Sequence, residues 1–551
     1  MSELSLETGR QIGLLVDRGG YVEHVVVGDA HQLHLPDIGR GRAGSGRFRG
    51  LRLVHTHLRN EGLTRDDLTD LTLLRLDAVV AIQMRLDGLP GWVETGTLKS
   101  MVADGAAEGG EDAPWLVERE PSIHSYHTDF LAFINDLEAQ FSKRDQGLRV
   151  GDREGVILIG VTTGDPTEAR ASLEELERLA NTAGLHILDR VLQVRRQFDG
   201  RYVIGQGKLR EVLIRAMQLG ADALIFDGEL APSQLRNIAT DTDLKVLDRT
   251  QLILDIFASR ARTREGKLQV ELAQLRYARP RLAIMPTAMS RLTGGIGGRG
   301  PGETKLEINK RRADERLTRL ERALKEISKH RGLRRARRAR VGLPTVALVG
   351  YTNAGKSTLL NSMTNASVDA EDKLFATLDP TSRRMRFPEE REVVLTDTVG
   401  FIRRLPKDLV HAFRSTLDEA TEADVILHVA DASSPELETH LETVDETLRA
   451  LGAADTPRML VFNKRDAAPP ELVETLLERY GGVAVSAVTR EGLTTLVLEL
   501  ERVLFRERAA ARGLADPDGY GAQGDGEALD DSYTPAEVYE LDAPPVSGAD
   551  L

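Results

Sequence analysis

The segment from Gly350 to Ser357 has the residue types and spacing needed to hold phosphate groups. It reads Gly350, Tyr351, Thr352, Asn353, Ala354, Gly355, Lys356 and Ser357, which fits the pattern G-x-x-x-x-G-K-[ST]. In such a loop the glycines turn backbone N–H groups toward phosphate oxygens, and the positive end of the following helix dipole adds attraction. The lysine reaches the β and γ phosphates and the serine hydroxyl coordinates Mg²⁺. The segment therefore predicts a site for a nucleoside triphosphate and Mg²⁺.

Two later segments offer groups for the metal and the γ phosphate. The first is Phe375, Ala376, Thr377, Leu378 and Asp379, where Thr377 supplies a second hydroxyl for the metal on a segment that senses the γ phosphate. The second is Asp397, Thr398, Val399 and Gly400, where a carboxylate holds the metal's water shell and a glycine N–H faces the γ phosphate. We predict Lys356, Thr377, Asp397 and Gly400 as catalytic residues, and Ser357 and Thr377 as metal ligands.

Two segments nearer the end of the chain suit the recognition of guanine. The first is Asn463, Lys464, Arg465 and Asp466, and the second is Ser486, Ala487 and Val488. An aspartate at position 466 accepts both hydrogen bonds that guanine donates from N1 and its 2-amino group, a pair that adenine lacks. The backbone of the second segment can contact the guanine oxygen. Each motif alone also occurs by chance, but the five in this order predict GTP as the substrate.

Phe401 follows the predicted catalytic glycine, where many GTPases carry a glutamine that orients the attacking water. A phenylalanine side chain can neither donate nor accept a hydrogen bond. We therefore expect slow intrinsic hydrolysis and a partner that completes the site. Asn353 is compatible with K⁺ beside Mg²⁺, although asparagine at a tight turn commonly caps its own backbone.

Short apolar runs lead into these loops and are predicted to be buried strands that position them. They span residues 345–349, 391–396, 458–462 and 483–485, and a helix is expected from residue 357. This pattern favours a P-loop α/β domain over residues 342–508.

Composition restricts the rest of the molecule. The 551 residues are too many for one core, and the absence of cysteine excludes disulfides and thiolate metal sites. No signal peptide and no run of about 18 apolar residues is found, so we expect a soluble, cytoplasmic protein without a membrane span. A net charge of −13 argues against nonspecific nucleic-acid binding by the whole molecule.

Basic charge is concentrated between residues 304 and 340, where apolar residues recur at helical spacing. A second helical stretch is expected over residues 251–277, and the glycine-rich segment 293–303 lies between the two. Residues 251–341 thus predict a helical arm with a loop at its tip. A solvated linker is the plain interpretation of a charge run, but the excess of arginine beside a glycine loop favours structured RNA as the partner.

Residues 151–250 alternate strand and helix signals and predict a small α/β domain. Strands are expected over residues 156–161 and 223–227, and a helix over residues 167–183 after Pro166. The segment Gly205–Lys208 is interpreted as a plain turn.

Several segments together resemble the HflX-type GTPases of the Obg-HflX group of translational GTPases. They are residues 202–208, 248–250, 260–275, 294–297, 299–304 and 397–402. The resemblance runs from about Gly155 to Arg506. It implies a GTPase that binds the large (50S) ribosomal subunit, places its arm against ribosomal RNA near the peptidyl transferase centre, and acts in splitting or rescue of ribosomes, translation or biogenesis. Family members share the hydrophobic residue at Phe401, so the ribosome is the expected activator.

Residues 1–150 resemble a JAB/JAMM or RadC-like domain plus a linker helix. Paired strands are expected over residues 11–17 and 21–27, and another strand leads into His55 and His57, with Thr64 and Asp67 beyond. The metal-binding form of that fold holds Zn²⁺ with an upstream glutamate, an H-x-H pair and an aspartate, and Glu7 stands in the glutamate's place. Two functions are therefore weighed for the whole chain: a ribosome-associated GTPase, and a metal-dependent isopeptidase or peptidase that its GTPase domain regulates. We favour the ribosome-associated GTPase, and we interpret this region as a non-catalytic domain that keeps its histidines in preference to a working metal site.

The chain as a whole is predicted to be an α/β, multidomain protein. The predicted parts are an α+β JAB-like domain (1–150), a small α/β domain (151–250), a basic helical arm (251–341), the P-loop GTPase domain (342–508) and a disordered acidic tail (509–551). We expect a monomer.

Overall fold

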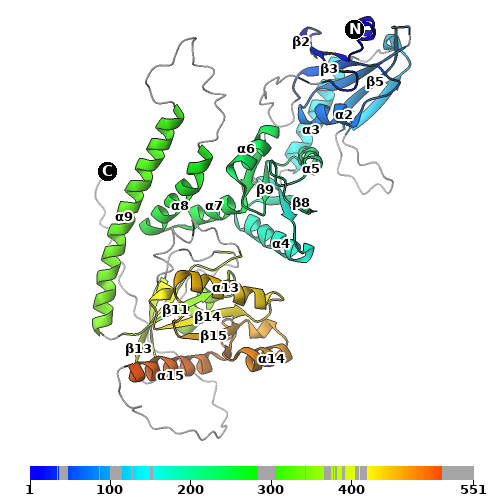
Figure 1. Cartoon of the computed structure of the whole chain (residues 1–551). Coiled ribbons are helices and arrows are strands. Elements are labelled where there is room, and N and C mark those ends of the chain that lie inside the picture. The colour runs from blue at the N-terminus through cyan, green and yellow to red at the C-terminus, as the bar shows by residue number, and fades with distance from the viewer. Residues whose placement is uncertain are drawn as a thin grey trace. The chain divides into compact units, whose positions relative to one another are not determined.

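The computed structural model divides the chain into two compact units, Met1–Arg249 and Thr250–Leu551 (Figure 1). It describes residues 1–33, 35, 48–85, 87–99, 115–125, 129–148, 153–242, 244–282, 305–341, 343–364, 374, 375, 378, 381–387, 391–403, 409 and 419–511. The glycine-rich segment 293–303 and the predicted tail lie outside these ranges, so the expectations for them stay predictions. None of the helices described has the length and apolar character that a membrane span requires.

The first unit begins with a six-stranded sheet of order β2-β1-β3-β4-β5-β6. Its strands are β1 (Ile12–Asp17), β2 (Val22–Val27), β3 (Leu51–His57), β4 (Ala78–Met84), β5 (Pro90–Leu98) and β6 (Trp115–Glu120). All neighbours run antiparallel except β3 and β4, which are parallel. The expected pairing of the first two strands is therefore confirmed.

Three α-helices and one short 3₁₀ helix accompany this sheet: α1 (Ser2–Thr8), α2 (Arg65–Leu73), η1 (Ile123–Ser125) and α3 (Phe130–Leu148). Leu53 of β3 packs with Leu71 of α2 and Ile134 of α3 in one buried cluster. Because side chains alternate along a strand, His55 and His57 share the face of Leu53. Strand β3 thus directs both imidazoles toward the face of the sheet that α2 and α3 cover.

A four-stranded parallel sheet of order β10-β9-β7-β8 follows in the same unit. It consists of β7 (Gly155–Thr162), β8 (His186–Val194), β9 (Ala223–Phe226) and β10 (Lys245–Asp248), with helices α4 (Pro166–Thr182), α5 (Gln206–Leu219) and α6 (Pro232–Asp241). The expected α/β alternation is confirmed. The plain turn expected at Gly205–Lys208 is wrong, because Gly205 is the N-cap of α5 and the helix starts at the next residue.

The arm consists of α7 (Arg249–Arg260), α8 (Arg264–Leu282) and α9 (Lys305–Val341), of which α8 and α9 lie side by side (Figure 1). The long basic helix is confirmed. The single helical stretch expected over residues 251–277 is wrong, because helix α7 ends at Arg260 and a separate helix, α8, begins at Arg264. There the Thr263 hydroxyl accepts a hydrogen bond from the Gly266 N–H at 3.0 Å and starts a new helix.

Helices α8 and α9 are joined by apolar and ionic contacts. Leu272 of α8 packs against Leu317 and Leu320 of α9. The Arg316 guanidinium lies 2.7 Å from the Glu271 carboxylate, and Arg276 is 2.7 Å from Glu321. Some of the arm's arginines therefore hold α8 and α9 together, and only the rest of its positive charge is available to a polyanion.

The GTPase domain contains a six-stranded sheet of order β12-β13-β11-β14-β15-β16, in which only β12 and β13 are antiparallel. The strands are β11 (Thr345–Gly350), β12 (Thr381–Arg386), β13 (Glu392–Asp397), β14 (Val425–Asp431), β15 (Arg458–Asn463) and β16 (Val483–Ala484). The helices are α10 (Lys356–Thr364), α13 (Leu437–Leu451), α14 (Pro470–Tyr480) and α15 (Leu493–Ala511), with the short 3₁₀ helix η3 (Arg465–Ala467).

Buried residues of α10 and α15 pack on one face of this sheet, and those of α13 and α14 pack on the other. Because the parallel strands point the same way, their C-terminal ends meet at one edge. That edge carries the loops that begin after β11, β13 and β15, which is where the predicted site residues lie.

Candidate nucleotide-binding site

The phosphate-binding loop joins β11 to α10, as predicted. Gly350 has φ 156° and Gly355 has φ 86°, both in the region that glycine adopts without strain. A Cβ atom at Gly350 would clash with the Val429 carbonyl oxygen, and one at Gly355 would clash with the Asn463 side-chain amide. Both glycines are therefore required by close packing as well as by backbone conformation.

Lys356 is the buried cation of this loop. Its side chain is only 6% exposed, and Nζ donates hydrogen bonds to the carbonyl oxygens of Gly350 at 3.1 Å and Tyr351 at 2.9 Å. Burial lowers the pKa of Lys356 to about 8, and the nearby Asp397 carboxylate opposes this only in part. A buried ammonium held by neutral carbonyls is an environment that an anionic phosphate would improve.

The two predicted metal-side groups that the structure describes lie together. Ser357, at the start of α10, donates a hydrogen bond from Oγ to Asp397 Oδ2 at 2.6 Å. Asp397 ends β13 and is 1% exposed. A hydroxyl beside a carboxylate is an all-oxygen set that suits Mg²⁺. Thr377, Ala376 and Asp379 lie outside the described residues, so the second metal hydroxyl stays a prediction.

Gly400 lies against the phosphate-binding loop. A Cβ atom there would come within 3.1 Å of Lys356 Nζ and 2.9 Å of Thr352 Cγ2. The Phe401 N–H donates to the Gly350 carbonyl at 3.1 Å, and the Thr352 N–H donates to the Phe401 carbonyl at 2.7 Å. Phe401 is 1% exposed, so its ring packs in the interior and leaves the phosphate region to other groups.

Asn463 joins the predicted guanine segments to the phosphate-binding loop. Its Nδ2 donates to the Ala354 carbonyl at 2.9 Å, and its Oδ1 accepts from the Ala487 N–H at 3.0 Å. Ser486 is buried, and its Oγ accepts from the Thr489 N–H at 3.0 Å. Three motifs therefore meet through one side chain, which lies 109 residues after Ala354 and 24 residues before Ala487.

The residues after Asn463 complete this corner. Lys464, at φ 62°, forms an ion pair with Asp431 at 2.8 Å, and the Arg465 guanidinium pairs with Glu491 at 2.9 Å. Asp466 lies in η3, and Val488 is 77% exposed. The loop is thus held by its own ion pairs, and the predicted base-reading aspartate follows directly.

Phe375, two residues before the predicted metal hydroxyl of Thr377, packs on the arm. Phe375, at φ 57° and 2% exposed, meets the Phe257 ring of α7 edge to face with centroids 4.6 Å apart. Leu378 is also buried. An aromatic side chain in the left-handed region is unusual and is held there by its surroundings.

Sequence reasoning missed a second cluster beside the loop. The Tyr351 ring stacks on His440 of α13 with centroids 3.8 Å apart, and its hydroxyl oxygen accepts from the Arg403 N–H at 3.0 Å. The Arg403 guanidinium pairs with Glu436 at 2.9 Å. The only sequence signal was the arginine shortly after Phe401, because the partners are distant in the chain.

The first unit contains a separate cluster of polar side chains. His55 Nε2 and His57 Nε2 are 2.8 Å apart, and they lie 3.3 Å and 3.5 Å from the Asp67 carboxylate oxygens. Both imidazoles are buried. The atoms of His55, His57 and Asp67 that could bind a metal ion all lie within 4.8 Å of one another. Thr64 caps α2 and also donates its hydroxyl to Asp67 at 2.7 Å, which orients the carboxylate.

The fourth group expected in that cluster is absent from it. Glu7 is exposed on α1, whereas Ser5 of the same helix points inward and bonds Thr56 at 2.7 Å. Two residues correspond to about 200° around a helix, so both cannot face the sheet. The expectation that Glu7 completes the set is wrong.

The cluster compensates its own charge. Burial opposes ionisation of Asp67, but hydrogen bonds from His55 and His57 outweigh it and lower the pKa of Asp67 well below its ordinary value. Burial also opposes a charge on His57, yet hydrogen bonding to Asp67 raises its pKa overall. Two imidazoles and a carboxylate fit the donor set of a zinc site with an open position.

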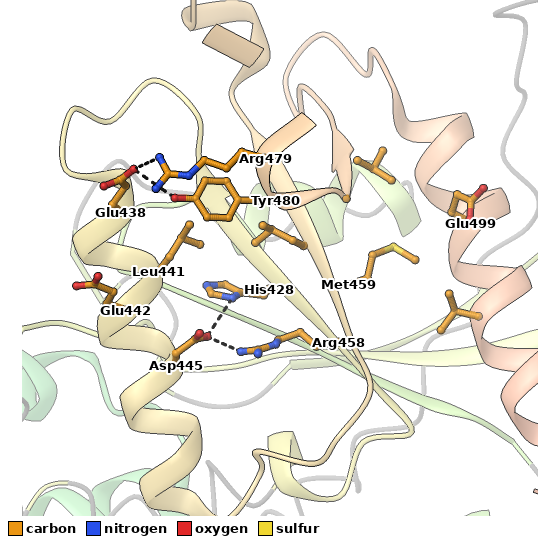
Figure 2. Close-up of a pocket in the computed structure, with 14 residues that line it drawn as sticks. His428, Glu438, Leu441, Glu442, Asp445, Arg458, Met459, Arg479, Tyr480 and Glu499 are labelled. Carbon is orange, nitrogen blue, oxygen red and sulfur yellow. Dashed lines mark hydrogen bonds and ion pairs between the residues drawn. The ribbon is translucent and has the colours of Figure 1, made fainter. Parts of the chain in front are cut away.

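A cavity of about 630 Å³ lies elsewhere in the GTPase domain, between α13, β15 and α15 (Figure 2). His428, whose pKa burial lowers to about 4, lies in its wall near Asp445, which also pairs with Arg458. None of the predicted site residues lines it. It begins at the N-terminal ends of strands whose opposite ends carry the nucleotide loops, so it is separate from the candidate site.

The second unit contains a P-loop GTPase. The features that define it are a mainly parallel sheet, a glycine loop before a helix, a buried lysine, and an Asn–Lys–Arg–Asp segment that is hydrogen-bonded to that loop. Three family models match the chain: "GTP-binding GTPase N-terminal" over residues 170–258, "GTP-binding GTPase Middle Region" over residues 260–338, and "50S ribosome-binding GTPase" over residues 345–464.

Curated relatives agree with these models. The chain is 49% identical over 355 residues to GTPase HflX of Lacrimispora saccharolytica, which covers 64% of this chain and 84% of that protein. It is 44% identical over 340 residues to GTPase HflX of Escherichia coli, covering 61% and 80%. A solved GTP-binding protein from Sulfolobus solfataricus in complex with GDP is 24% identical, with a TM-score of 0.36 and coverage of 64% and 99%. The chain belongs to the HflX GTPase family and is a GTP hydrolase.

Proposed function

We propose that residues 350–357 bind the phosphates of GTP and that the chain hydrolyses GTP in association with the large ribosomal subunit. The observation that carries the nucleotide site is Lys356, a buried ammonium with a lowered pKa and only carbonyl partners at hydrogen-bond distance. Ser357 and Asp397 would hold Mg²⁺ and its water shell, together with Thr377. Gly400 would face the γ phosphate through its N–H.

Guanine is proposed to lie against residues 463–466 and 486–488. Asn463 holds the two segments at one corner through its bonds to Ala354 and Ala487. Asp466 would then accept from the base, and the backbone of Ala487 and Val488 would contact the guanine oxygen. Phe375 and Leu378, both buried, would anchor the segment that carries Thr377.

Association with the ribosome is supported by two observations. The family model that matches residues 345–464 is described as a 50S ribosome-binding GTPase. The arm presents a long helix, α9, whose sequence is rich in arginine and lysine, and such positive charge suits a phosphate backbone. We further propose that the protein is a cytoplasmic monomer. On this proposal it acts in ribosome splitting or rescue, translation or biogenesis.

Sedimentation of the full chain with purified large subunits tests this association. With a non-hydrolysable GTP analogue the wild-type chain should pellet with the subunits, and deletion of residues 294–302 should abolish pelleting. The matched control replaces the same residues with an equally long Gly-Ser segment. GTP turnover should rise when subunits are added. Turnover and nucleotide affinity that ignore the subunits would refute the association.

K⁺ is a further proposed cofactor at Asn353. This residue is exposed at φ 63° within the loop, so its side chain is accessible to an ion beside the phosphates. Turnover measured in equal concentrations of KCl and NaCl should favour KCl in the wild type and lose that preference in Asn353→Ala. Equal rates in both salts would contradict the K⁺ site and indicate that Asn353 only stabilises the turn.

The N-terminal domain is proposed to be JAB-like and to hold Zn²⁺ through His55, His57 and Asp67. The observation that favours this is the convergence of the two Nε2 atoms and the Asp67 carboxylate within 4.8 Å. A bound Zn²⁺ would polarise a carbonyl group or a water molecule. The residues of this chain would orient the ion, because Thr64 fixes the Asp67 carboxylate.

Metal analysis of the purified full chain tests the zinc site. The wild type should contain about one zinc per chain, and His55→Ala with His57→Ala should contain none. His24→Ala with His31→Ala, two exposed histidines of the same domain, is the matched control and should retain zinc. Cleavage of an isopeptide-linked substrate that requires His55 and His57 would favour the peptidase alternative.

A further inference from the structure

Thr352 is a buried side chain of the phosphate-binding loop whose hydroxyl has no hydrogen-bond partner in the described part of the chain. It is 7% exposed, and Oγ1 is both inaccessible and unbonded. Its backbone N–H, in contrast, donates to the Phe401 carbonyl at 2.7 Å. Buried hydroxyls are nearly always hydrogen-bonded, so this one indicates a partner that arrives with the ligand.

The position of Thr352 relates it to the γ phosphate. A Cβ atom on Gly400 would lie 2.9 Å from Thr352 Cγ2 and 3.1 Å from Lys356 Nζ. Gly400 and Lys356 are two of the groups assigned to the γ phosphate. Thr352 therefore contacts the same small volume as both. The adjacent Asn353 is exposed, so of these two neighbours it is Thr352 that is directed into the protein.

The two other polar side chains assigned to this volume for which the structure gives contacts, Lys356 and Ser357, have their own bonds. The Lys356 ammonium is bonded to the Gly350 and Tyr351 carbonyls, and Ser357 donates to Asp397. Phe401, in the position where a glutamine would orient water, is buried and apolar. The Thr352 hydroxyl is unbonded, and its Cγ2 lies beside Gly400. Because Cγ2 and Oγ1 are carried by the same Cβ, a rotation about χ1 exchanges them and brings the hydroxyl to the γ-phosphate side.

We propose that the Thr352 hydroxyl positions the attacking water at the γ phosphate, the task that Phe401 cannot perform. This inference rests on the proposed GTP site. A hydroxyl accepts one hydrogen bond and donates another, so Thr352 can accept from the water while it donates to a γ-phosphate oxygen. The water oxygen then bonds to the γ phosphorus as the bond to the β–γ bridging oxygen breaks, and GDP leaves with that electron pair. One proton of the water passes to the released phosphate, and Thr352 keeps its own proton.

Three variants of the full chain separate this role from a structural one. Thr352→Val keeps the shape and removes the hydroxyl, Thr352→Ser keeps the hydroxyl, and Thr364→Val removes another buried hydroxyl, on α10, that bonds only to Leu360. The measurements are the affinity for a non-hydrolysable GTP analogue and the single-turnover rate with Mg²⁺ and saturating GTP.

Thr352→Val should lower the single-turnover rate by about a hundredfold, with and without large subunits, while affinity stays within about twofold. Thr352→Ser should stay within about threefold of the wild-type rate, and Thr364→Val should match the wild type. A Thr352→Val enzyme of normal rate overturns the inference, as does an equal loss in Thr352→Ser or a loss confined to affinity. A wild-type chain that binds no GTP would instead refute the proposed function.

Discussion

The nucleotide site and the His55–His57–Asp67 cluster both gather buried polar groups, but they treat charge in opposite ways. Lys356 is a buried cation whose pKa is lowered to about 8, and its close partners are neutral carbonyls. In the cluster, Asp67 and His57 stabilise each other's charged forms, so their pKa values move apart. A buried charge that its neighbours compensate only in part, as Asp397 does for Lys356, indicates a ligand of opposite sign, whereas a compensated cluster is stable with or without one.

The two sites also differ in how their members are connected. Residues 350–357 are contiguous and need only a strand-to-helix turn to converge. The cluster takes its members from β3 and α2, with His57 and Asp67 separated by a loop and a helix start. The comparison predicts large effects of substitution at the first site and smaller ones at the second.

Lys356→Ala should have the largest effect on ligand binding, and it tests most directly whether the two sites differ in how they treat charge. Removing the ammonium eliminates the charge that faces the β and γ phosphates, so GTP affinity should fall by at least about a thousandfold. Isothermal titration with a non-hydrolysable analogue measures it. Because the buried charge is also removed, the free variant should be no less stable than the wild type. Wild-type affinity in this variant would contradict the site.

Asp466→Asn should change the base that is recognised. An amide presents a donor and an acceptor in place of two acceptors, which suits xanthine and leaves a guanine donor unpaired. The ratio of GTP to XTP affinity should fall by about a hundredfold. Competition between the two nucleotides measures it, and Asp455→Asn, on an exposed turn outside the site, is the control. Unchanged guanine selectivity would remove Asp466 from the base contact.

The pH dependence of GTP binding should follow Lys356. The ammonium is present below a pKa of about 8 in the free protein, so affinity should be level there and fall by about tenfold per pH unit above it. The free energy of unfolding of the nucleotide-free protein should change in the opposite sense. Between pH 8 and the ordinary lysine pKa the unfolded chain binds more protons, so stability rises with pH in that window.

The Lys356→Ala variant is the control for that stability slope, because it lacks the titrating group. Its unfolding free energy should lose the rise that the wild type shows above pH 8. A slope of the same size in both proteins would assign the titration to another residue.

Zinc removal should have the smallest effect on the protein, and it tests directly whether the cluster depends less on its ligand than the nucleotide site does. Chelation should lower the unfolding temperature of the wild type by a few degrees, because a ligand that binds only the folded state stabilises it. His55→Ala with His57→Ala should not respond to the chelator. A large collapse of the N-terminal domain on chelation would show that the cluster depends on its ligand as strongly as the nucleotide site does.

Much of the nucleotide site was predictable because each motif is local. The glycine loop, Asp397 at the end of a strand and Asn463 after another are each defined by a few adjacent residues, and strand ends that share an edge bring them together. The same local logic predicted the long basic helix α9 and the strand that holds His55 and His57.

Other features could not be predicted, because they depend on which face of a helix is buried or on residues far away in the sequence. Glu7 and Ser5 compete for the inward side of a seven-residue helix, and nothing in so short a segment decides its rotation. The break between α7 and α8 depends on one Thr263 cap, and the stack of Tyr351 on His440 joins residues 89 positions apart.

From its amino-acid order alone, this chain was determined to be a GTPase with a basic arm, because short motifs set backbone conformation and chemical type within a few residues. Only the tertiary structure decided that Thr352 is buried with its hydroxyl unbonded and its Cγ2 beside Gly400, that Phe401 turns into the interior, and that Glu7 stays outside its cluster. The physical reason is that burial and hydrogen-bond satisfaction depend on neighbours from the whole fold, which no local spacing specifies.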